Sequence, residues 1–486
     1  RIPLGVMTLM GSKCYDWRFR SAPHEHLGGR VVGVPRGRTL GGSGSINSMV
    51  YIRGRPSDYD RWADLGCTGW AWSDVLKRYK RAERNARGAS ELHGDAGPLF
   101  VEDLPSPHPM VENFVRAGAD AGVPANDDFN GPCQEGLGNY QATMHNGRRW
   151  SPADAYLHPA KKRPNLTVMT GTEIDRLEFD GQRAVGARTV AGRLIEAAGE
   201  VVLAAGAIAS PAILLRSGIG PGAHLAEHGI ECVLDQPAVG ANLHDHPAIG
   251  MHYGGGRHGY ALSLATLPAN ALAPLRYLLG RKGLFASNTV EAGGFARTRP
   301  DLTEPDVQFH FIPARLGHEG SAVVWGRGYY SDVCLLKPRS RGRLSLAARD
   351  PRTAPNIDLN LLADTDDDAD LLAGAKLLRR ILSSPHLKTG DARELIPGPN
   401  VASDEELRAM IHERLGTAYH PVGTCRMGPS GHAETVVDPR LSLVGIDNVR
   451  VADASIMPEV IAGNTNAASM MIGEAAAEFI AEDGAA

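Results

Sequence analysis

Two short segments far apart in the chain carry side chains that can move a proton and hold an oxygen atom. His420 begins the run His-Pro-Val-Gly-Thr-Cys, and Asn464 lies in the run Gly-Asn-Thr-Asn-Ala. An imidazole takes up a proton near neutral pH, whereas a carboxamide hydrogen-bonds an oxygen without taking charge. A lone His-Pro pair is more often an ordinary buried histidine before a turn, so reading His420 as a base depends on other segments.

A third segment, residues 37–47, is a glycine- and serine-rich loop with the sequence GRTLGGSGSIN. Glycine allows backbone N–H groups to approach a phosphate or a flat cofactor ring closely. Alone, such a run would more often be a flexible turn. Its presence together with the histidine and asparagine segments favours a cofactor-binding loop.

These segments resemble the glucose–methanol–choline (GMC) family of FAD-dependent oxidoreductases, in particular its choline-dehydrogenase-like branch. The likeness also covers residues 48–54 and 206–220, and all four places follow the family's order. The resemblance implies oxidation of an alcohol to an aldehyde or ketone by hydride transfer to flavin N5, with His420 as the base. Asn464 would hydrogen-bond the same oxygen. The electrons would pass to a quinone, another carrier or oxygen.

The resemblance also assigns residues to FAD. They are Arg38, Gly41, Gly42, Ser43, Gly44, Ser45, Asn47, Ile174, Ala204, Ala205, Gly206, Asp453, Ala454, Asn464 and Thr465. Some relatives link FAD covalently through a histidine at the position of Ile46, and an isoleucine cannot form that link, so we expect non-covalent FAD. Asp453 is equally well explained as a helix or turn cap, and Ala204 as part of a core strand.

Three more residues are candidates for the substrate pocket: Glu291, His310 and Tyr419. In choline-oxidising relatives a glutamate near the position of Glu291 attracts the ammonium group of the substrate. The sequence shows no aromatic cluster that would enclose a quaternary ammonium, and a structural turn acid is the favoured reading of Glu291.

His244 and His246 flank an aspartate and would face the same side of a strand, as two metal ligands do. No third ligand set is apparent, and the family has a comparable Asp-His pair near the flavin, so no metal is expected.

One segment of the family is absent. Family members begin with a strand, a GxGxxG turn and a helix that bind the FAD diphosphate. Nothing of this kind precedes Arg1. We therefore expect about 70–90 residues, the size of such a unit with its extension, to be missing, and a second chain is one place for them. Two alternatives stay open: a lyase on the same fold with a structural flavin, and an inactive fragment or binding subunit.

Composition narrows the function classes. The chain has 486 residues with 51 Lys plus Arg against 55 Asp plus Glu, a net charge of −4 that argues against nucleic acid as a partner. Its six cysteines form no CxxC pair, which indicates neither a zinc site nor a disulfide framework. We expect a reducing, cytoplasmic location, because scattered cysteines are typical there.

The elements that must position these residues alternate between strands and helices. We expect strands at 165–170, 174–179, 200–207, 305–311, 331–337, 341–346 and 448–453, and helices at 58–62, 72–79 with Ser73 as N-cap, 210–217, 364–382 and 466–481.

This alternation predicts an α/β protein with a discontinuous, Rossmann-like FAD-binding domain and a substrate domain of a sheet plus helices. The FAD-binding parts are 1–50, 165–250 and 436–486, the cap and substrate region is 51–164, and the substrate domain is 251–435.

Overall fold

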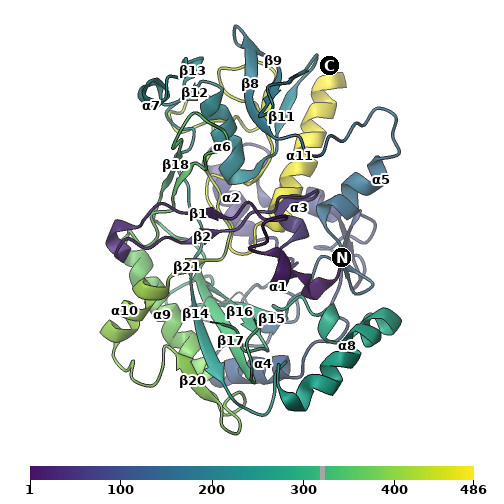
Figure 1. Cartoon of the computed structure of the whole chain (residues 1–486), viewed down its shortest axis with the longest axis vertical. Coiled ribbons are helices and arrows are strands. Elements are labelled where there is room, and N and C mark those ends of the chain that lie inside the picture. The colour runs from purple at the N-terminus through teal and green to yellow at the C-terminus, as the bar shows by residue number, and fades with distance from the viewer. Residues whose placement is uncertain (318–322, 486) are drawn as a thin grey trace.

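The computed structural model describes residues 1–317 and 323–485 and has two lobes (Figure 1). The lower lobe in that view holds a large antiparallel sheet, and the upper lobe holds smaller sheets. Helix α11 (Asn466–Ala485) begins near the middle of the molecule and runs up through the upper lobe to the C-terminus. The expected helix over 466–481 is therefore confirmed.

The large sheet has seven strands in the order β20-β14-β17-β16-β15-β5, with β21 also paired to β14. Its strands are β5 (Gly136–Asn139), β14 (Pro247–Gly254), β15 (Ala292–Ala296), β16 (Val307–Ile312), β17 (Gly328–Leu335), β20 (Arg393–Ile396) and β21 (Gly416–Thr417). Every residue of β15 and β16 is buried, because helices cover the sheet. Helix α9 (Thr365–Leu382) packs on β17, β14 and β16, and α4 (Met110–Asp120) packs on β5.

The expected strands at 305–311 and 331–337 and the helix at 364–382 are confirmed by this lobe. The strand expected at 341–346 forms over a shorter stretch and does not join the large sheet, although it follows soon after 331–337 in the chain. Instead β18 (Arg343–Ser345) pairs with β19 (Asn356–Asp358) in a separate two-stranded sheet.

The upper lobe holds a three-stranded sheet and a parallel pair. Strands β8 (Ile174–Asp180), β9 (Arg183–Thr189) and β10 (Leu194–Glu196) form the sheet, and β11 (Val201–Leu203) runs parallel to β22 (Val449–Val451). The prediction of a strand at 165–170 was wrong, because that stretch is almost wholly exposed and forms no strand. Strand β11 was expected to be fully buried, but Val202 is 40% exposed.

Helix α6 (Gly206–Arg216) follows β11 and begins four residues before the predicted start. Pro211 therefore lies inside the helix, where it has no N–H for the carbonyl of Ala207. The hydroxyl of Thr424 donates to that carbonyl at 2.7 Å. A distant side chain thus replaces the missing helical hydrogen bond, which the local sequence could not reveal.

The cap region contains the two expected helices, α2 (Pro56–Asp64) and α3 (Trp72–Ala82). The predicted N-cap of α3 was wrong: the helix begins at Trp72, so its N-cap is Ala71 and not Ser73. The remaining helices and strands are α1 (Val6–Leu9), α5 (His158–Ala160), α7 (Gly222–Glu227), α8 (Leu267–Gly280), α10 (Asp404–Arg414), β1 (Phe19–Arg20), β2 (Gly33–Val34), β3 (Glu83–Asn85), β4 (Leu99–Val101), β6 (Met144–His145), β7 (Arg148–Arg149), β12 (Ile219–Gly220) and β13 (Leu234–Asp235). Among the described helices, none is long and apolar enough to cross a membrane.

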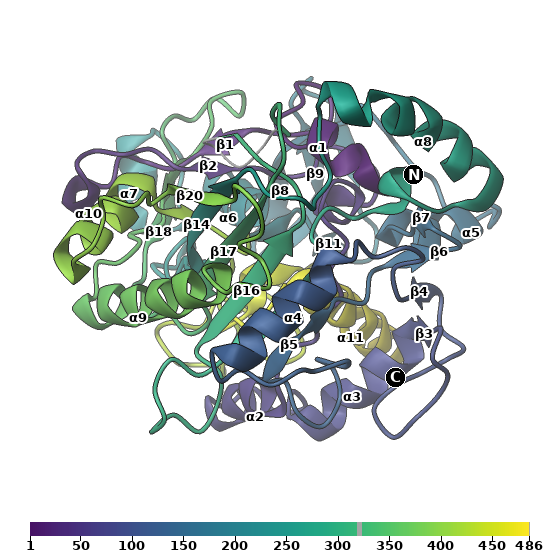
Figure 2. The same cartoon turned by 90° about the horizontal axis from the view of Figure 1, so that it is seen from below.

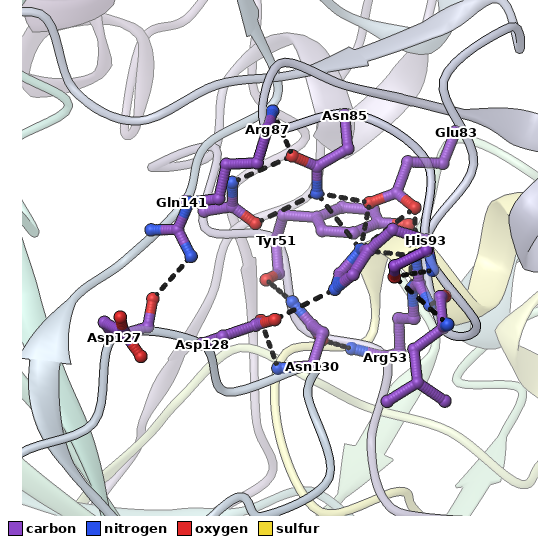
Figure 3. Close-up of polar contacts among 12 residues, drawn as sticks. Tyr51, Arg53, Glu83, Asn85, Arg87, His93, Asp127, Asp128, Asn130 and Gln141 are labelled. Carbon is purple, nitrogen blue, oxygen red and sulfur yellow. Dashed lines mark hydrogen bonds and ion pairs between the residues drawn. The ribbon is translucent and has the colours of Figure 1, made fainter.

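A buried polar cluster holds the cap region together (Figure 3). Arg53 and Glu83 form an ion pair with no exposed side-chain surface. His93 lies between carboxylates, with Nδ1 3.2 Å from Glu83 and Nε2 3.0 Å from Asp128. These hydrogen bonds outweigh the desolvation of the ring and raise the pKa of His93 to about 9, so the imidazole is charged at neutral pH.

Candidate active site

The structure brings His420 and Asn464 into contact although they come from separate segments. Asn464 Nδ2 lies 3.2 Å from Nε2 of His420 and 3.4 Å from Nε2 of His310. The amide oxygen of Asn464 accepts a hydrogen bond from Gln308 Nε2 at 2.9 Å. Because Gln308 holds the oxygen, both amide hydrogens of Asn464 point toward the two imidazoles.

The orientation of Gln308 is itself set by its neighbours. Tyr140 donates its hydroxyl hydrogen to the carbonyl of Phe309 at 2.7 Å, so its oxygen accepts from Gln308 Nε2 at 3.1 Å. The amide nitrogen of Gln308 therefore faces Tyr140 and Asn464, and its oxygen faces away. This determines which end of the Asn464 amide is the donor.

A second chain of hydrogen bonds fixes the tautomer of His420. His246 Nε2 lies 3.1 Å from the carbonyl oxygen of Ile461, which can only accept, so this nitrogen carries the hydrogen. Burial lowers the pKa of His246 to about 3, so its Nδ1 has a lone pair. That lone pair faces Nδ1 of His420 at 3.0 Å. His420 therefore donates from Nδ1 and keeps a lone pair on Nε2, next to Asn464.

The main chain around His420 is held by Asp245. One oxygen of Asp245 accepts from the backbone N–H of His420 at 2.8 Å and from that of His246 at 2.7 Å. Burial raises the pKa of Asp245 to about 7, although the nearby Arg36 opposes the shift. Burial lowers the pKa of His420, and His246 and His310 add to the effect, so its imidazole is neutral and ready to accept a proton.

His310 is the third polar group at this point. Its Nδ1 lies 2.8 Å from Asp332, whose other oxygen accepts from the hydroxyl of Tyr330 at 3.3 Å. Because a carboxylate only accepts, Nδ1 carries the hydrogen and Nε2 presents a lone pair toward Asn464. Tyr419, predicted for the pocket, precedes His420 with a φ of 65° and is 40% exposed.

Glu291, a candidate for the substrate pocket, makes several hydrogen bonds within the protein. It is fully buried, and its carboxylate accepts hydrogen bonds from Tyr260 at 2.9 Å, Ser287 at 2.5 Å and the backbone N–H of His108 at 2.6 Å. Burial raises its pKa.

The histidines beside Asp245 do not form a metal pair. His244 uses Nδ1 with the carbonyl of Asn242 at 2.7 Å, and its Nε2 accepts from the N–H of Val460 at 2.9 Å. Both nitrogens of His246 are engaged as well, with Ile461 and His420.

The glycine- and serine-rich loop leads into a short 3₁₀ turn, Gly42–Ser45. Its serine hydroxyls bond within the loop: Ser43 accepts from the N–H of Gly37 at 3.1 Å, and Ser45 donates to Leu40 at 2.7 Å. Gly42 has a φ of +55°, and an added Cβ would meet no atom within 4 Å. Gly42 thus presents open backbone, as a bound cofactor requires, whereas an added Cβ at Gly41 or Gly44 would meet Ser45 or Pro152 at 2.5 Å.

A buried cation without a full set of partners lies beside this loop. Arg149 donates from Nη1 to the carbonyl of Gly44 at 3.3 Å and to Oδ1 of Asn47 at 3.1 Å. Its Nε and Nη2 are buried and have no partner. Desolvation lowers the pKa of Arg149 to about 10, so it is still charged at neutral pH. An unpaired positive charge at this place matches the negative charge of FAD.

The ends of β11 and β22 bring the other predicted cofactor residues together. Because the strands are parallel, Ala204 and Ala205 at the end of β11 lie near Asp453 at the end of β22. Both alanines are exposed, and the space beside Gly206 is open. Asp453 has the capping role: its carboxylate accepts from the N–H of Gly206 at 2.8 Å and from Ser210 at 2.6 Å.

The remaining predicted cofactor residues lie near the glycine- and serine-rich loop, at the start of β8, after β22 and just before α11. Arg38 is exposed and pairs with Glu173 at 3.8 Å, next to Ile174 at the start of β8. Ala454 begins the 3₁₀ turn Ala454–Ile456, and Thr465 is buried just before α11. The open glycines, the exposed strand end and Arg149 together fit FAD.

The roles of three polar residues in the site were not predicted from the sequence. Gln308 lies two positions before His310 in a strand, so a shared face was foreseeable. His246 was considered as a metal ligand and as part of an Asp-His pair near the flavin, but its contact with His420 was not predicted. Nothing in the sequence around Arg149 indicated its buried position near Gly44.

Comparisons with known proteins show which family the chain belongs to. Residues 8–248 match the N-terminal and residues 338–473 the C-terminal family model of the GMC oxidoreductases. An alcohol dehydrogenase [acceptor] of Pseudomonas putida is 43% identical over 486 residues, 99% of this chain and 88% of the relative. An oxygen-dependent choline dehydrogenase of Brucella ovis is 40% identical over 483 residues, again 99% and 88% of the two chains.

A solved structure shows the same fold. Pyridoxine 4-oxidase from Mesorbium loti superposes with a TM-score of 0.86 at 31% identity, covering 98% of this chain and 90% of that one. Both lobes are thus shared, and the fold expected from the sequence is confirmed. With two matching family models and relatives of 40% and 43% identity along nearly its whole length, this chain belongs to the GMC oxidoreductases and is an enzyme of that type.

Proposed function

We propose that this protein is an FAD-dependent alcohol dehydrogenase or oxidase that converts an alcohol to an aldehyde or ketone. The observation that carries the proposal is the lone pair on Nε2 of His420, which faces the donor group of Asn464 at 3.2 Å. A base and a neutral donor side by side are what a hydroxyl group needs when it loses its proton. The two curated relatives, an alcohol and a choline dehydrogenase, support this reaction class.

The chain's own residues accept the hydroxyl proton and hydrogen-bond the substrate oxygen, and bound FAD supplies the hydride acceptor at its N5. Nε2 of His420 takes the hydroxyl proton, while its Nδ1–H stays hydrogen-bonded to His246. Asn464 donates to the oxygen as negative charge develops on it, and Gln308 keeps the amide in the donating orientation. Burial of these groups strengthens each interaction.

The contacts of Glu291 favour a neutral alcohol over a cationic one. A quaternary ammonium is bound by an aromatic enclosure or by a carboxylate that it can approach, and Glu291 has no exposed surface. Both oxygens of Glu291 already accept hydrogen bonds, from Tyr260, Ser287 and His108.

The electrons leave the protein to a separate acceptor, either a quinone, another carrier or oxygen. The name of the Pseudomonas relative specifies an acceptor, and that of the Brucella relative specifies oxygen. The contacts of His420 and Asn464 concern the alcohol half of the reaction and are compatible with each of these acceptors.

Anaerobic mixing of the FAD-loaded protein with an alcohol tests the proposal. Primary aliphatic alcohols should bleach the flavin, and choline should do so much more slowly. His420→Ala should slow bleaching by a factor on the order of 10²–10⁴, the usual contribution of a positioned base, whereas His432→Ala, at an exposed loop position, should not. A flavin that no alcohol reduces would point to the lyase alternative, and reduction of His420→Ala at the normal rate would exclude His420 as the base.

A further inference from the structure

Helix α8 and its surroundings expose an unusual amount of apolar surface. Six leucines of this region are 48–80% exposed: Leu264, Leu267, Leu272, Leu275, Leu278 and Leu279. Leu262 and Trp325 are 40% and 59% exposed. These eight residues, called here the α8 face, make up close to half of the large exposed hydrophobic side chains in the described part of the chain. Figures 1 and 2 show α8 at the edge of the molecule.

The leucines are exposed because the opposite side of the helix is anchored. Ala273 and Tyr277 are buried, and the hydroxyl of Tyr277 donates to the carbonyl of Gly147 at 3.2 Å. Leu275, Leu278 and Leu279 lie on the remaining side at helical spacing. The outward side of α8 is thus more apolar than its inward side, the reverse of a normal surface helix.

Leu262 and Trp325 extend the same surface beyond the helix. The N–H of Gly326, next to Trp325, donates to the carbonyl of Leu262 at 2.7 Å. Leu262 also lies two residues before Leu264, at the start of the turn Leu264–Thr266 that leads into α8. The α8 face therefore includes side chains from two chain segments, 262–279 and the segment of Trp325, and a backbone hydrogen bond holds these segments together.

The Lys, Arg, Asp and Glu residues of the chain segment that carries α8 are all basic. Residues 251–290 contain no aspartate or glutamate, but they contain Arg257, Arg276, Arg281 and Lys282, in a chain whose net charge is −4. Arg257, Arg276 and Lys282 are exposed. Arg281 ends α8 and stacks over Tyr277 at 4.8 Å. Three basic side chains, Arg276, Arg281 and Lys282, thus lie on α8 or directly after it and form the basic border of the apolar face.

We propose that the α8 face binds the surface of a membrane that contains anionic lipids. Leucines and a tryptophan bordered by arginine and lysine are the side chains of helices that lie in the membrane interface, and the basic border complements anionic head groups. The 14 residues of α8 extend about 21 Å, short of the ~30 Å hydrocarbon core, so the helix would lie on the membrane and not cross it.

Charge also argues against a second copy of the chain as the occupant. In a two-fold symmetric dimer the same patch meets itself, so the basic border of one copy would face that of the other. Such like charges repel each other, whereas an anionic bilayer attracts them. This proposal goes beyond alcohol oxidation and does not depend on it.

Co-sedimentation of the FAD-loaded full chain with vesicles tests the proposal. We expect binding to vesicles of phosphatidylcholine with phosphatidylglycerol, and little binding to phosphatidylcholine alone. The combined change Leu275→Ser, Leu278→Ser and Leu279→Ser should weaken binding at least about 100-fold, because it removes three large apolar side chains. Arg276→Gln with Lys282→Gln should weaken it on the order of 10-fold.

A matched control replaces three exposed apolar residues elsewhere: Leu166→Ser, Met169→Ser and Leu194→Ser. This variant should bind as the unchanged protein does, and all variants should keep their FAD content and melting temperature. Absence of binding to the anionic vesicles, or equal binding to both vesicle types, would overturn the proposal. So would light scattering that shows a dimer which the leucine changes convert to a monomer, because the face would then be occupied by a second copy.

Discussion

Nδ1 of His246 lies 3.0 Å from Nδ1 of His420, and the far nitrogen of His246 donates to the carbonyl of Ile461. A backbone carbonyl thereby determines which nitrogen of His420 holds the hydrogen. The base needs no rearrangement before it accepts a proton, because its lone pair already faces Asn464. Both histidines are buried, so water does not compete for these hydrogen bonds.

His246→Leu should slow flavin reduction, because Nδ1 of His420 would lose its acceptor and the ring would no longer be held in one tautomer. A wrong tautomer can cost up to ~10⁴-fold. Since His420 would still adopt the productive form part of the time, we expect a loss of about 10- to 100-fold. Stopped-flow reduction by an alcohol measures the effect.

The matched variant is His246→Gln, whose amide can accept from His420 and donate to Ile461 at the same time. It should recover much of the lost rate. If His246→Leu and His246→Gln reduce the flavin equally slowly, then packing and not the tautomer explains the loss.

Asn464→Ala should slow flavin reduction while FAD stays bound. Losing one donor to a developing oxyanion in a water-excluded site costs ~2.7–4 kcal/mol, or about 10²–10³ in rate. Gln308→Leu leaves Asn464 in place but frees its amide to rotate, so it should give a smaller loss. Rate and melting temperature are both measured: a lower melting temperature with an unchanged rate would remove Asn464 from the catalytic set.

Denaturing the holoprotein with acid should release yellow FAD into the supernatant. Ile46, at the end of the glycine- and serine-rich loop, is buried and has no atom that can bond to the flavin. A sample in which free FAD is added to flavin-free protein controls for trapping in the precipitate. Colour that stays with the precipitated protein beyond this control would show a covalent link at another residue.

The protein should become less stable as the pH rises from about 6.5 to 9. His93 has a folded pKa of about 9 against an ordinary value of 6.5, so its contribution is complete below the ordinary value and is lost as the pH passes the folded one. The difference corresponds to at most about 3 kcal/mol.

Denaturant unfolding across this pH range compares the unchanged protein with His93→Gln. The variant lacks the titrating ring that lies between Glu83 and Asp128, so its stability should change less with pH. Parallel curves for the two proteins would contradict the assignment of the pH dependence to His93.

The sequence by itself was sufficient for the family and for much of the fold. Helix α9 was predicted from apolar residues at helical spacing such as Leu371 and Leu378, and the β8–β9 hairpin from Asp180-Gly181 at its turn. These features depend on residues close in sequence. The domain boundaries, the non-covalent FAD and a nucleotide-binding segment ahead of Arg1 stay predictions.

Only the tertiary structure decided how the site residues are oriented. The tautomer of His420 depends on His246, which lies 174 residues away in the sequence. His246 is in turn oriented by Ile461, which lies 215 residues from His246. The start of α6 depends on Asp453, 247 residues from Gly206. Helix α8 was missed because its leucines face outward, against the pattern of a buried apolar stripe. Local sequence encodes helix and strand preferences, but hydrogen bonds between distant segments form only when the chain folds, and these bonds set the chemistry of the site.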